Sequence, residues 1–210
     1  MWYRIKMEGI FMYSEAANKS TIRTMVLTGL MIAITFIMSY TFLGTIILPV
    51  VSITLAFIPA IVTVMTVGFV PGLIVAASAG IFSLIRAFYV FTWLAPFLQN
   101  PLVSVFPRVM IVVAVFAVFA ALNKTKLPKV LTVGISAAAG SITNTVGVLG
   151  MAWLLYGAAW HEVAVERGHA SVWAMIVFIV TTNAALEVVG NTIIVTAVVM
   201  TLRKARLSKF

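Results

Sequence analysis

Six long apolar segments follow one another along this chain, with little sequence between them. A helix needs about 20 mostly apolar residues to cross the hydrocarbon core of a bilayer. Only 9% of the residues are charged, whereas a soluble domain has about 25%, so most of the surface must face lipid. The sequence therefore predicts an all-α, polytopic membrane protein with six transmembrane helices. These cover about residues 22–42, 53–67, 72–90, 102–122, 130–156 and 172–202.

The second segment is the weakest of the six as a spanning helix. It is short, and it contains Pro59 near its start, although apolar residues from Ile46 onward lead into it. Proline is tolerated inside membrane helices, where neighbouring helices satisfy the carbonyl that it frees. We therefore expect kinks near Pro59 and near Pro107, which falls early in the fourth segment.

The basic residues indicate how the predicted bundle is oriented. With six spans, eleven of the fourteen Lys and Arg residues fall on one face, and the positive-inside rule makes that face cytoplasmic. Both termini are expected there, with residues 1–21 as an N-terminal segment, 22–202 as the membrane domain and 203–210 as a basic tail. Topology and anionic headgroups thus account for the net charge of +9, without nucleic acid as a partner. The eleven are Arg4, Lys6, Lys19, Arg23, Lys124, Lys126, Lys129, Arg203, Lys204, Arg206 and Lys209.

Two arginines lie where membrane insertion penalises them. Arg86 is near the outer end of the third segment, and Arg108 is about two turns into the fourth. A charge inside a span costs roughly 3 kcal/mol on insertion scales, so it normally faces a cavity or a partner. One interpretation is that both side chains extend to the outer headgroups. The other is a cationic pocket near Asn100, open to the outside and suited to a carboxylate, with Trp93 in the loop that closes it.

Polar residues inside the last two segments form a second group of candidates. Asn183, Glu187 and Asn191 recur every four residues and so share one helix face, which should point into the bundle. Asn183 is the shallower candidate for binding a ligand, whereas Glu187 is deep enough to form a structural ion pair instead. Asn144 in the fifth segment is either a ligand-binding residue or an interhelical hydrogen-bonding one. Trp153 belongs to an interfacial aromatic belt or stacks on a ligand.

Gly29 and Ala33 in the first segment form a small-xxx-small pair, which permits close helix contact either within the bundle or with another membrane subunit.

Several residue types and motifs that carry chemistry are missing from the sequence. There is no cysteine, no aspartate and no GxxxxGK[ST] loop, so we expect no metal site, no cofactor and no ATPase site in this chain. A membrane enzyme would need convergent acid–base or metal-binding groups, which are also missing.

Several stretches resemble one family of membrane proteins. They are Asn100–Arg108 (NPLVSVFPR), Phe82–Phe88 (FSLIRAF), Ile53–Pro59 (ITLAFIP) and the Gly29/Ala33 pair, although the family more commonly has Ala at the position of Gly29. Together they are similar to the substrate-binding S components of energy-coupling factor (ECF) vitamin transporters of the bacterial plasma membrane. The resemblance implies six helices and an outward pocket for a vitamin. It also implies a partner module of one membrane T subunit and two cytosolic ATPases, with Gly29 and Ala33 docking the T subunit.

The resemblance leaves the ligand open, because S components diverge by vitamin. Two outer arginines favour an anion, and a pantothenate-type component fits best, because Asn and Thr side chains could bind the hydroxyl and amide groups of such a monocarboxylate. Folate also carries carboxylates. A riboflavin-type component is the alternative, because aromatic residues could stack on the ligand. A stand-alone secondary transporter is a further alternative, although we find no inverted pair of discontinuous helices. The aromatic residues are Tyr89, Phe91, Trp93, Phe97 and Trp153.

Overall fold

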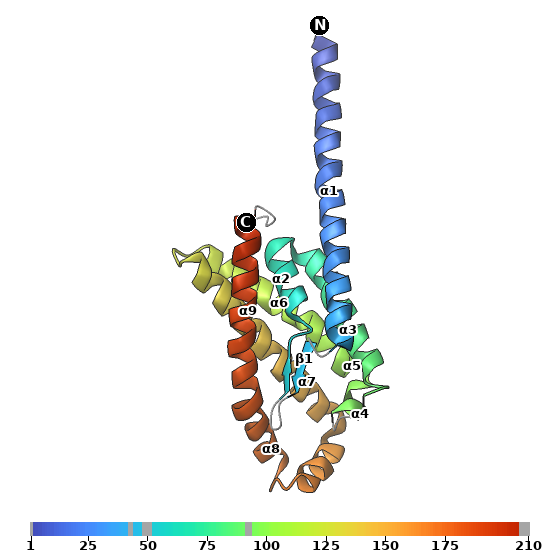
Figure 1. Cartoon of the computed structure of the whole chain (residues 1–210), viewed down its shortest axis with the longest axis vertical. Helices are drawn as coiled ribbons and strands as arrows, with labels where there is room; N and C mark the ends of the chain where they lie inside the picture. Colours follow the sequence, from blue (N-terminus) through green and yellow to red (C-terminus); the bar gives the residue numbers. More distant parts are fainter. Residues whose placement is uncertain (1, 42–43, 48–51, 91–93, 206–210) are drawn as a thin grey trace.

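The computed structural model describes residues 2–41, 44–47, 52–90 and 94–205. Helix α1 covers Trp2–Tyr40 and extends well beyond the rest of the bundle at its N-terminal end (Figure 1). Its apolar part, Ser20–Tyr40, is long enough to cross a membrane. Thr28, Thr35 and Ser39 each donate a hydrogen bond to the carbonyl four residues earlier. Their hydroxyls are thereby satisfied within the helix, as an apolar surrounding requires.

A hairpin and a short helix occupy the place of the expected second span. Strands β1 (Thr45–Ile47) and β2 (Ser52–Thr54) pair antiparallel, with Thr45 opposite Thr54. Helix α2 follows at Ile58–Thr66. The all-α prediction therefore missed a strand pair, which β-branched residues such as Ile46 and Ile53 favour. With nine residues, α2 is also too short to cross a bilayer alone.

The two prolines that were expected to kink helices instead lie at helix starts. Pro59 is in the first turn of α2, and Pro107 is in the first turn of α6 (Phe106–Asn123). A first-turn N–H has no partner within the helix, so a proline there sacrifices no hydrogen bond. The fourth segment is nevertheless interrupted near Pro107, because the span Pro101–Asn123 consists of two helices that meet at Val105. Gly68 separates α2 from α3 (Phe69–Arg86). Its φ is 138°, a backbone conformation that residues other than glycine rarely adopt.

The other predicted spans correspond to long helices. Between α3 and α6, the chain forms two short helices, α4 (Ala95–Leu98) and α5 (Pro101–Ser104). Helix α7 (Lys129–Glu166) has a kink at Tyr156, where φ is −132° and ψ is 32°. The last segment runs through α8 (Val172–Ile179), a π-helical turn η2 (Val180–Ala184) and α9 (Ala185–Lys204). Within the described residues, five helices are long and apolar enough to cross a membrane.

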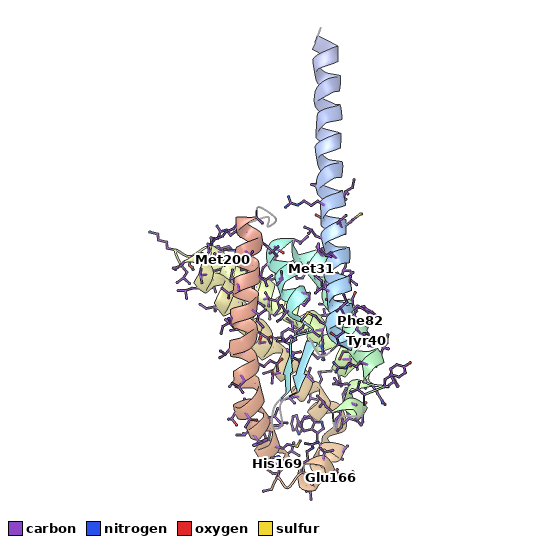
Figure 2. All side chains as sticks on the ribbon, viewed as in Figure 1. Met31, Tyr40, Phe82, Glu166, His169 and Met200 are labelled. Carbon is purple, nitrogen blue, oxygen red and sulfur yellow. The ribbon has the colours of Figure 1, made fainter. Side chains whose placement is uncertain are left out.

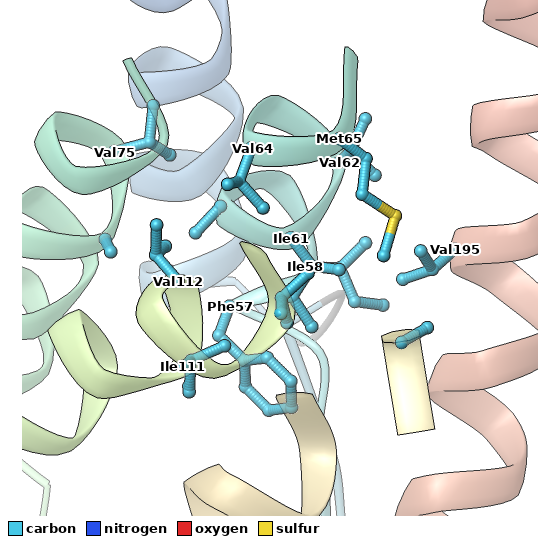
Figure 3. Close-up of a cluster of buried hydrophobic side chains, with 14 of the residues drawn as sticks. Phe57, Ile58, Ile61, Val62, Val64, Met65, Val75, Ile111, Val112 and Val195 are labelled. Carbon is cyan, nitrogen blue, oxygen red and sulfur yellow. The ribbon is translucent and has the colours of Figure 1, made fainter. Parts of the chain in front are cut away.

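Helix α2 lies at the centre of the bundle, and all of its residues are buried. It packs against α3, α6 and α9. Figure 3 shows Ile61 and Met65 of α2 in one apolar cluster with Val112 of α6 and Val195 of α9. A second cluster, around Trp160, fills the space between α4, α7 and α8. Two apolar clusters therefore pack the helices together.

The basic connection after α6 and the turn between α7 and α8 lie at opposite ends of the bundle (Figures 1 and 2). The connection between α6 and α7 lies at the same end as the C-terminal end of α9 (Figure 1). His169 and Glu166, at the turn between α7 and α8, lie at the opposite end from Met200 (Figure 2). The end near Met200 is thus the one that carries the basic connection after α6, with its residues Lys124 and Lys126.

Candidate functional site

A pocket lies where the C-terminal end of α1 meets the β2–α2 connection, α3 and the start of α6. Its empty volume is about 380 Å³, including the space at its open mouth. The sequence places Ala79, Ser83 and Arg86 on one face of α3, because they are four and three residues apart. The lining consists of Ser39, Thr54, Ala56, Phe57, Ala79, Ser83, Arg86 and Arg108. It therefore combines two cations and several hydroxyl or carbonyl groups with a small apolar wall.

Arg108 is the most deeply placed charge of this lining, with 9% of its surface exposed. Its Nη1 donates a hydrogen bond to the carbonyl oxygen of Val103 (3.2 Å), and its Nη2 donates to Ser83 Oγ (3.3 Å). These bonds join the start of α6 to α5 and α3. A guanidinium has more N–H groups than these two bonds use, so Arg108 retains donors for an anion in the pocket. Arg86 is partly buried at the end of α3 and lines the same pocket.

Polar residues of α7 and α9 form a cluster behind Arg108. Glu187 is 7% exposed, and its Oε1 accepts a hydrogen bond from Asn144 Nδ2 at 3.4 Å. No direct ion pair joins Glu187 to Arg108 among the described contacts of the two side chains. Asn191, one turn further along α9, donates through Nδ2 to the carbonyl of Thr54 at 3.4 Å. Glu187 and Asn191 thus face the interior, as their spacing predicted.

Several buried polar atoms of α7 and α9 have no hydrogen-bond partner within the described part of the chain. They are Ser141 Oγ and Asn144 Oδ1 of α7, and Asn191 Oδ1, Thr192 Oγ1 and Thr196 Oγ1 of α9. Such groups are rare in apolar interiors because each one costs about 1–3 kcal/mol of desolvation. The interface between α7 and α9 is therefore polar at mid-depth, next to the pocket and not open to it.

Other predicted binding residues lie away from the pocket lining. Asn100 caps α5: its Oδ1 accepts from the N–H of Leu102 at 2.9 Å, and its Nδ2 donates to Tyr156 Oη at 3.1 Å. It thus connects the loop before α6 to the kink of α7. Trp153 is 39% exposed and packs against Trp173, with ring centroids 5.6 Å apart. Direct ligand contacts by Asn100, Asn144 and Trp153 remain predictions. Trp93 and the side chain of Asn183 lie outside the described residues.

The predicted docking pair lies on the outer side of α1. Gly29 and Ala33 are both exposed, and a Cβ added at Gly29 would meet nothing within 4 Å. Among the described residues, the pair therefore makes no close contact within the bundle. Large apolar side chains extend the same exposed face along the helix, at Ile22, Met25, Val26, Leu30, Phe36 and Ile37.

Sequence reasoning missed the hydroxyl and apolar parts of the lining. Ser83 was within reach of such reasoning, because it is three residues before Arg86 and so on the same helix face. Ser39, Thr54 and Phe57 gave no comparable signal. Thr54 and Phe57 reach the pocket because a hairpin and a short helix replace the expected second span, whereas Ser39 lies in the last turn of α1.

A comparison with protein families adds an independent observation. Residues 23–199 match the family model of the ECF transporter, substrate-specific component. The chain belongs to this family. The match begins beside the predicted start of the membrane domain and includes every element that lines the pocket. Members of the family bind a small-molecule substrate and work with membrane and ATPase subunits, so this S component is a multi-pass membrane protein for transport. No curated protein matches the chain.

Proposed function

We propose that this S component binds an anionic vitamin, of the pantothenate type, in the pocket that contains Arg86 and Arg108. The observation that carries the proposal is that both arginines line one pocket, although they belong to different helices. The vitamin enters from outside the bacterial plasma membrane. A shared T subunit and two cytosolic ATPases then drive its delivery inward.

The charges around the pocket support an anionic ligand. Arg86 and Arg108 lie in the lining, and the only acidic residue of the cluster behind them is Glu187. A cation in an apolar surrounding is costly unless it is paired. A carboxylate accepts two parallel N–H bonds from a guanidinium, and such charge-assisted bonds are stronger than neutral ones. A bound carboxylate therefore compensates the excess positive charge of the pocket.

The rest of the lining favours a small aliphatic vitamin. Ser39 and Ser83 provide hydroxyl groups, and Ala56 and Ala79 leave room for methyl groups. These groups suit a monocarboxylate that carries hydroxyl and amide groups. Phe57 is the only aromatic side chain in the described lining, and stacking on a flavin would call for more. Riboflavin- and folate-type ligands are accordingly the alternatives.

The orientation of the protein follows from the distribution of charge. We assign six crossings, with the β1–β2 hairpin and α2 together as the second, and both termini in the cytoplasm. The basic connection after α6 and the C-terminal end of α9 lie at the same end of the bundle (Figure 1), which supports this assignment. The pocket, at the end of α3 and the start of α6, then belongs to the outer half.

The exposed face of α1 suits the T subunit. Gly29 and Ala33 permit a partner helix to approach closely, and the apolar side chains beside them supply contact area.

The chain acts as a transport subunit, not an enzyme, and takes its energy from the ATPases. A stand-alone secondary transporter would instead concentrate its ligand without them. Uptake into vesicles that contain only this chain, driven by an ion gradient, would therefore refute the proposal.

Calorimetry on the purified full chain tests the ligand. A panel of B vitamins should show tight binding of pantothenate. Arg108→Ala and Arg86→Ala should each weaken it by roughly 30-fold or more, because truncation of a buried charge partner costs about 2–5 kcal/mol. Arg167→Ala is the matched control, since Arg167 lies beyond the end of α7, away from the pocket. If both pocket variants keep wild-type affinity, the anion site is wrong.

A further inference from the structure

We infer that two serines of the pocket lining, Ser83 and Ser39, have opposite hydrogen-bonding roles and thereby fix the direction in which a ligand binds. The hydroxyl of Ser83 donates to the anionic group that Arg108 binds, whereas the oxygen of Ser39 accepts from a hydroxyl or amide N–H of the ligand. The inference rests on the proposed function. It adds which polar group of the ligand lies at which side of the pocket.

The two serines belong to different helices whose last turns meet. Ser39 is in the last turn of α1, and Ser83 is in the last turn of α3. Their neighbours Tyr40 and Phe82 lie close together, with ring centroids 6.3 Å apart (Figure 2). Both serines line the pocket. A ligand in the pocket therefore has one hydroxyl group from α1 and one from α3 to contact.

The proton of Ser39 is already used within α1. Its Oγ donates to the carbonyl oxygen of Thr35 at 2.7 Å, and a serine hydroxyl has one proton and two lone pairs. Serine and threonine side chains in helices commonly bond the carbonyl four residues earlier in this way. The oxygen of Ser39 is therefore left as an acceptor, which a hydroxyl or amide N–H of the ligand can use.

Ser83 has the opposite arrangement. Ser78 of the same helix donates to the carbonyl oxygen of Ile74 at 2.9 Å, but among the described contacts Ser83 makes no such bond to α3. Its Oγ instead accepts a hydrogen bond from Nη2 of Arg108 at 3.3 Å. A guanidinium has donors and no acceptor, so the proton of Ser83 cannot be directed at Arg108. This proton is therefore left for an acceptor in the pocket.

The position of this proton determines which group it can bind. Because Ser83 Oγ and Arg108 Nη2 are bonded to each other, an atom that approaches both of them meets O–H and N–H donors side by side. A carboxylate accepts several hydrogen bonds at once, and bonds to a charged acceptor are stronger than neutral ones. A group that only donates, such as an ammonium, would find no acceptor there. The carboxylate of the ligand therefore lies beside Ser83 and Arg108, with a hydroxyl or amide group towards Ser39.

Calorimetry on the purified full chain with two probes tests these roles. The probes are pantothenate and pantothenol, in which an uncharged CH₂OH group replaces the carboxylate. Ser83→Ala should weaken pantothenate by roughly tenfold or more, as is typical for loss of a hydrogen bond to a charged group, and pantothenol by a smaller factor. Ser39→Ala should weaken both probes by a similar factor, because both have the same remaining hydroxyl and amide groups. Ser78→Ala is the matched control and should change neither affinity, since Ser78 is outside the lining.

A double variant separates donation to the ligand from positioning of Arg108. In the Arg108→Ala background, Ser83→Ala should weaken pantothenate by a further factor of roughly three or more, because the hydroxyl contacts the carboxylate itself. If it has no effect in that background, Ser83 acts only through Arg108 and the inference is wrong. Ser83→Thr keeps the hydroxyl and should keep most of the affinity. A loss as large as that of Ser83→Ala would contradict a role for the hydroxyl.

The ratio of the two affinities separates this inference from the function on which it rests. If the wild type binds pantothenate but Ser83→Ala and Ser39→Ala change the ratio of pantothenate to pantothenol affinity alike, the two serines do not have opposite roles. If the wild type binds neither probe, the proposed function fails and this inference fails with it.

Discussion

Replacement of Gly80 by alanine tests how the pocket is held together. Gly80 lies on α3, three residues before Ser83, and faces the short helix α5. A Cβ at this position would lie 2.7 Å from the Cα of Val105 and 3.2 Å from the carbonyl oxygen of Ser104. Both are backbone atoms, so no side-chain rotation relieves the clash. Helix α5 and the start of α6 must move as a unit.

The size of the effect follows from these distances. Carbon atoms pack at about 3.5–4.0 Å, so the backbone at Val105 must retreat by about 1 Å. Arg108 is three residues further on, and its bond to Ser83 Oγ is already 3.3 Å long. A displacement of that size breaks this bond. Overpacking of this kind costs about 1–3 kcal/mol, less the roughly 1 kcal/mol that alanine gains over glycine in a helix.

Thermal unfolding of the purified chain without ligand measures this cost. We expect Gly80→Ala to lower Tm by up to about 8 °C, because the net cost is up to about 2 kcal/mol and 1 kcal/mol shifts the Tm of a chain of this size by about 2–4 °C. Gly150→Ala is the matched control, because an added Cβ there meets nothing within 4 Å. It should keep or raise Tm. If Gly80→Ala unfolds at or above the temperature of Gly150→Ala, the close packing of α3 on α5 does not hold the site together.

Three further predictions concern other parts of the protein. Tyr156→Phe removes the hydrogen bond from Asn100. Such a bond contributes about 0.5–1.5 kcal/mol, so the Tm of the ligand-free protein should fall by a few degrees. An unchanged Tm would mean that the bond does not stabilise the loop before α6. Ala33→Leu should abolish co-purification with the T subunit, because the added bulk prevents close approach to α1. The vitamin affinity should stay at the wild-type value. Loss of affinity with retained assembly would contradict the docking role. Tags at both termini should be protected from reagents applied outside intact cells, whereas a cysteine introduced at His169 should react, and an outside C-terminus would overturn the orientation.

The main spans were predictable because hydropathy identifies long apolar helices directly. The structure of the second segment was not predictable from hydropathy. A run of apolar residues has the same hydropathy whether it forms one spanning helix or a hairpin followed by a short buried helix. What decides between them is burial. All residues of α2 are enclosed by other helices, and enclosure is a property of the assembled bundle that local sequence does not carry. Pro59 was a local clue, since proline is commonest in the first turn of a helix.

The candidate site was predictable in its charges and not in its other parts. Arg86 and Arg108 flank one outer loop on consecutive segments, so their convergence followed from topology and from the cost of burying a charge. The ligand contact of Asn100 remains a prediction, and the structure shows a role that sequence reasoning did not give it, as a helix cap. An asparagine directly before a proline and an apolar run is in fact a common helix start. Thr54 reaches the pocket only through the hairpin, which sequence reasoning did not expect.

The bond between Asn191 and the carbonyl of Thr54 has a consequence for biogenesis. Strand edges are not tolerated in lipid, so β2 requires protein around it. One of the groups that satisfies it belongs to α9, which is synthesised after every element that lines the pocket. This part of the pocket wall therefore stays without that bond until α9 has inserted and packed. A fragment that ends before α9 would contain both arginines and still lack this support of the wall.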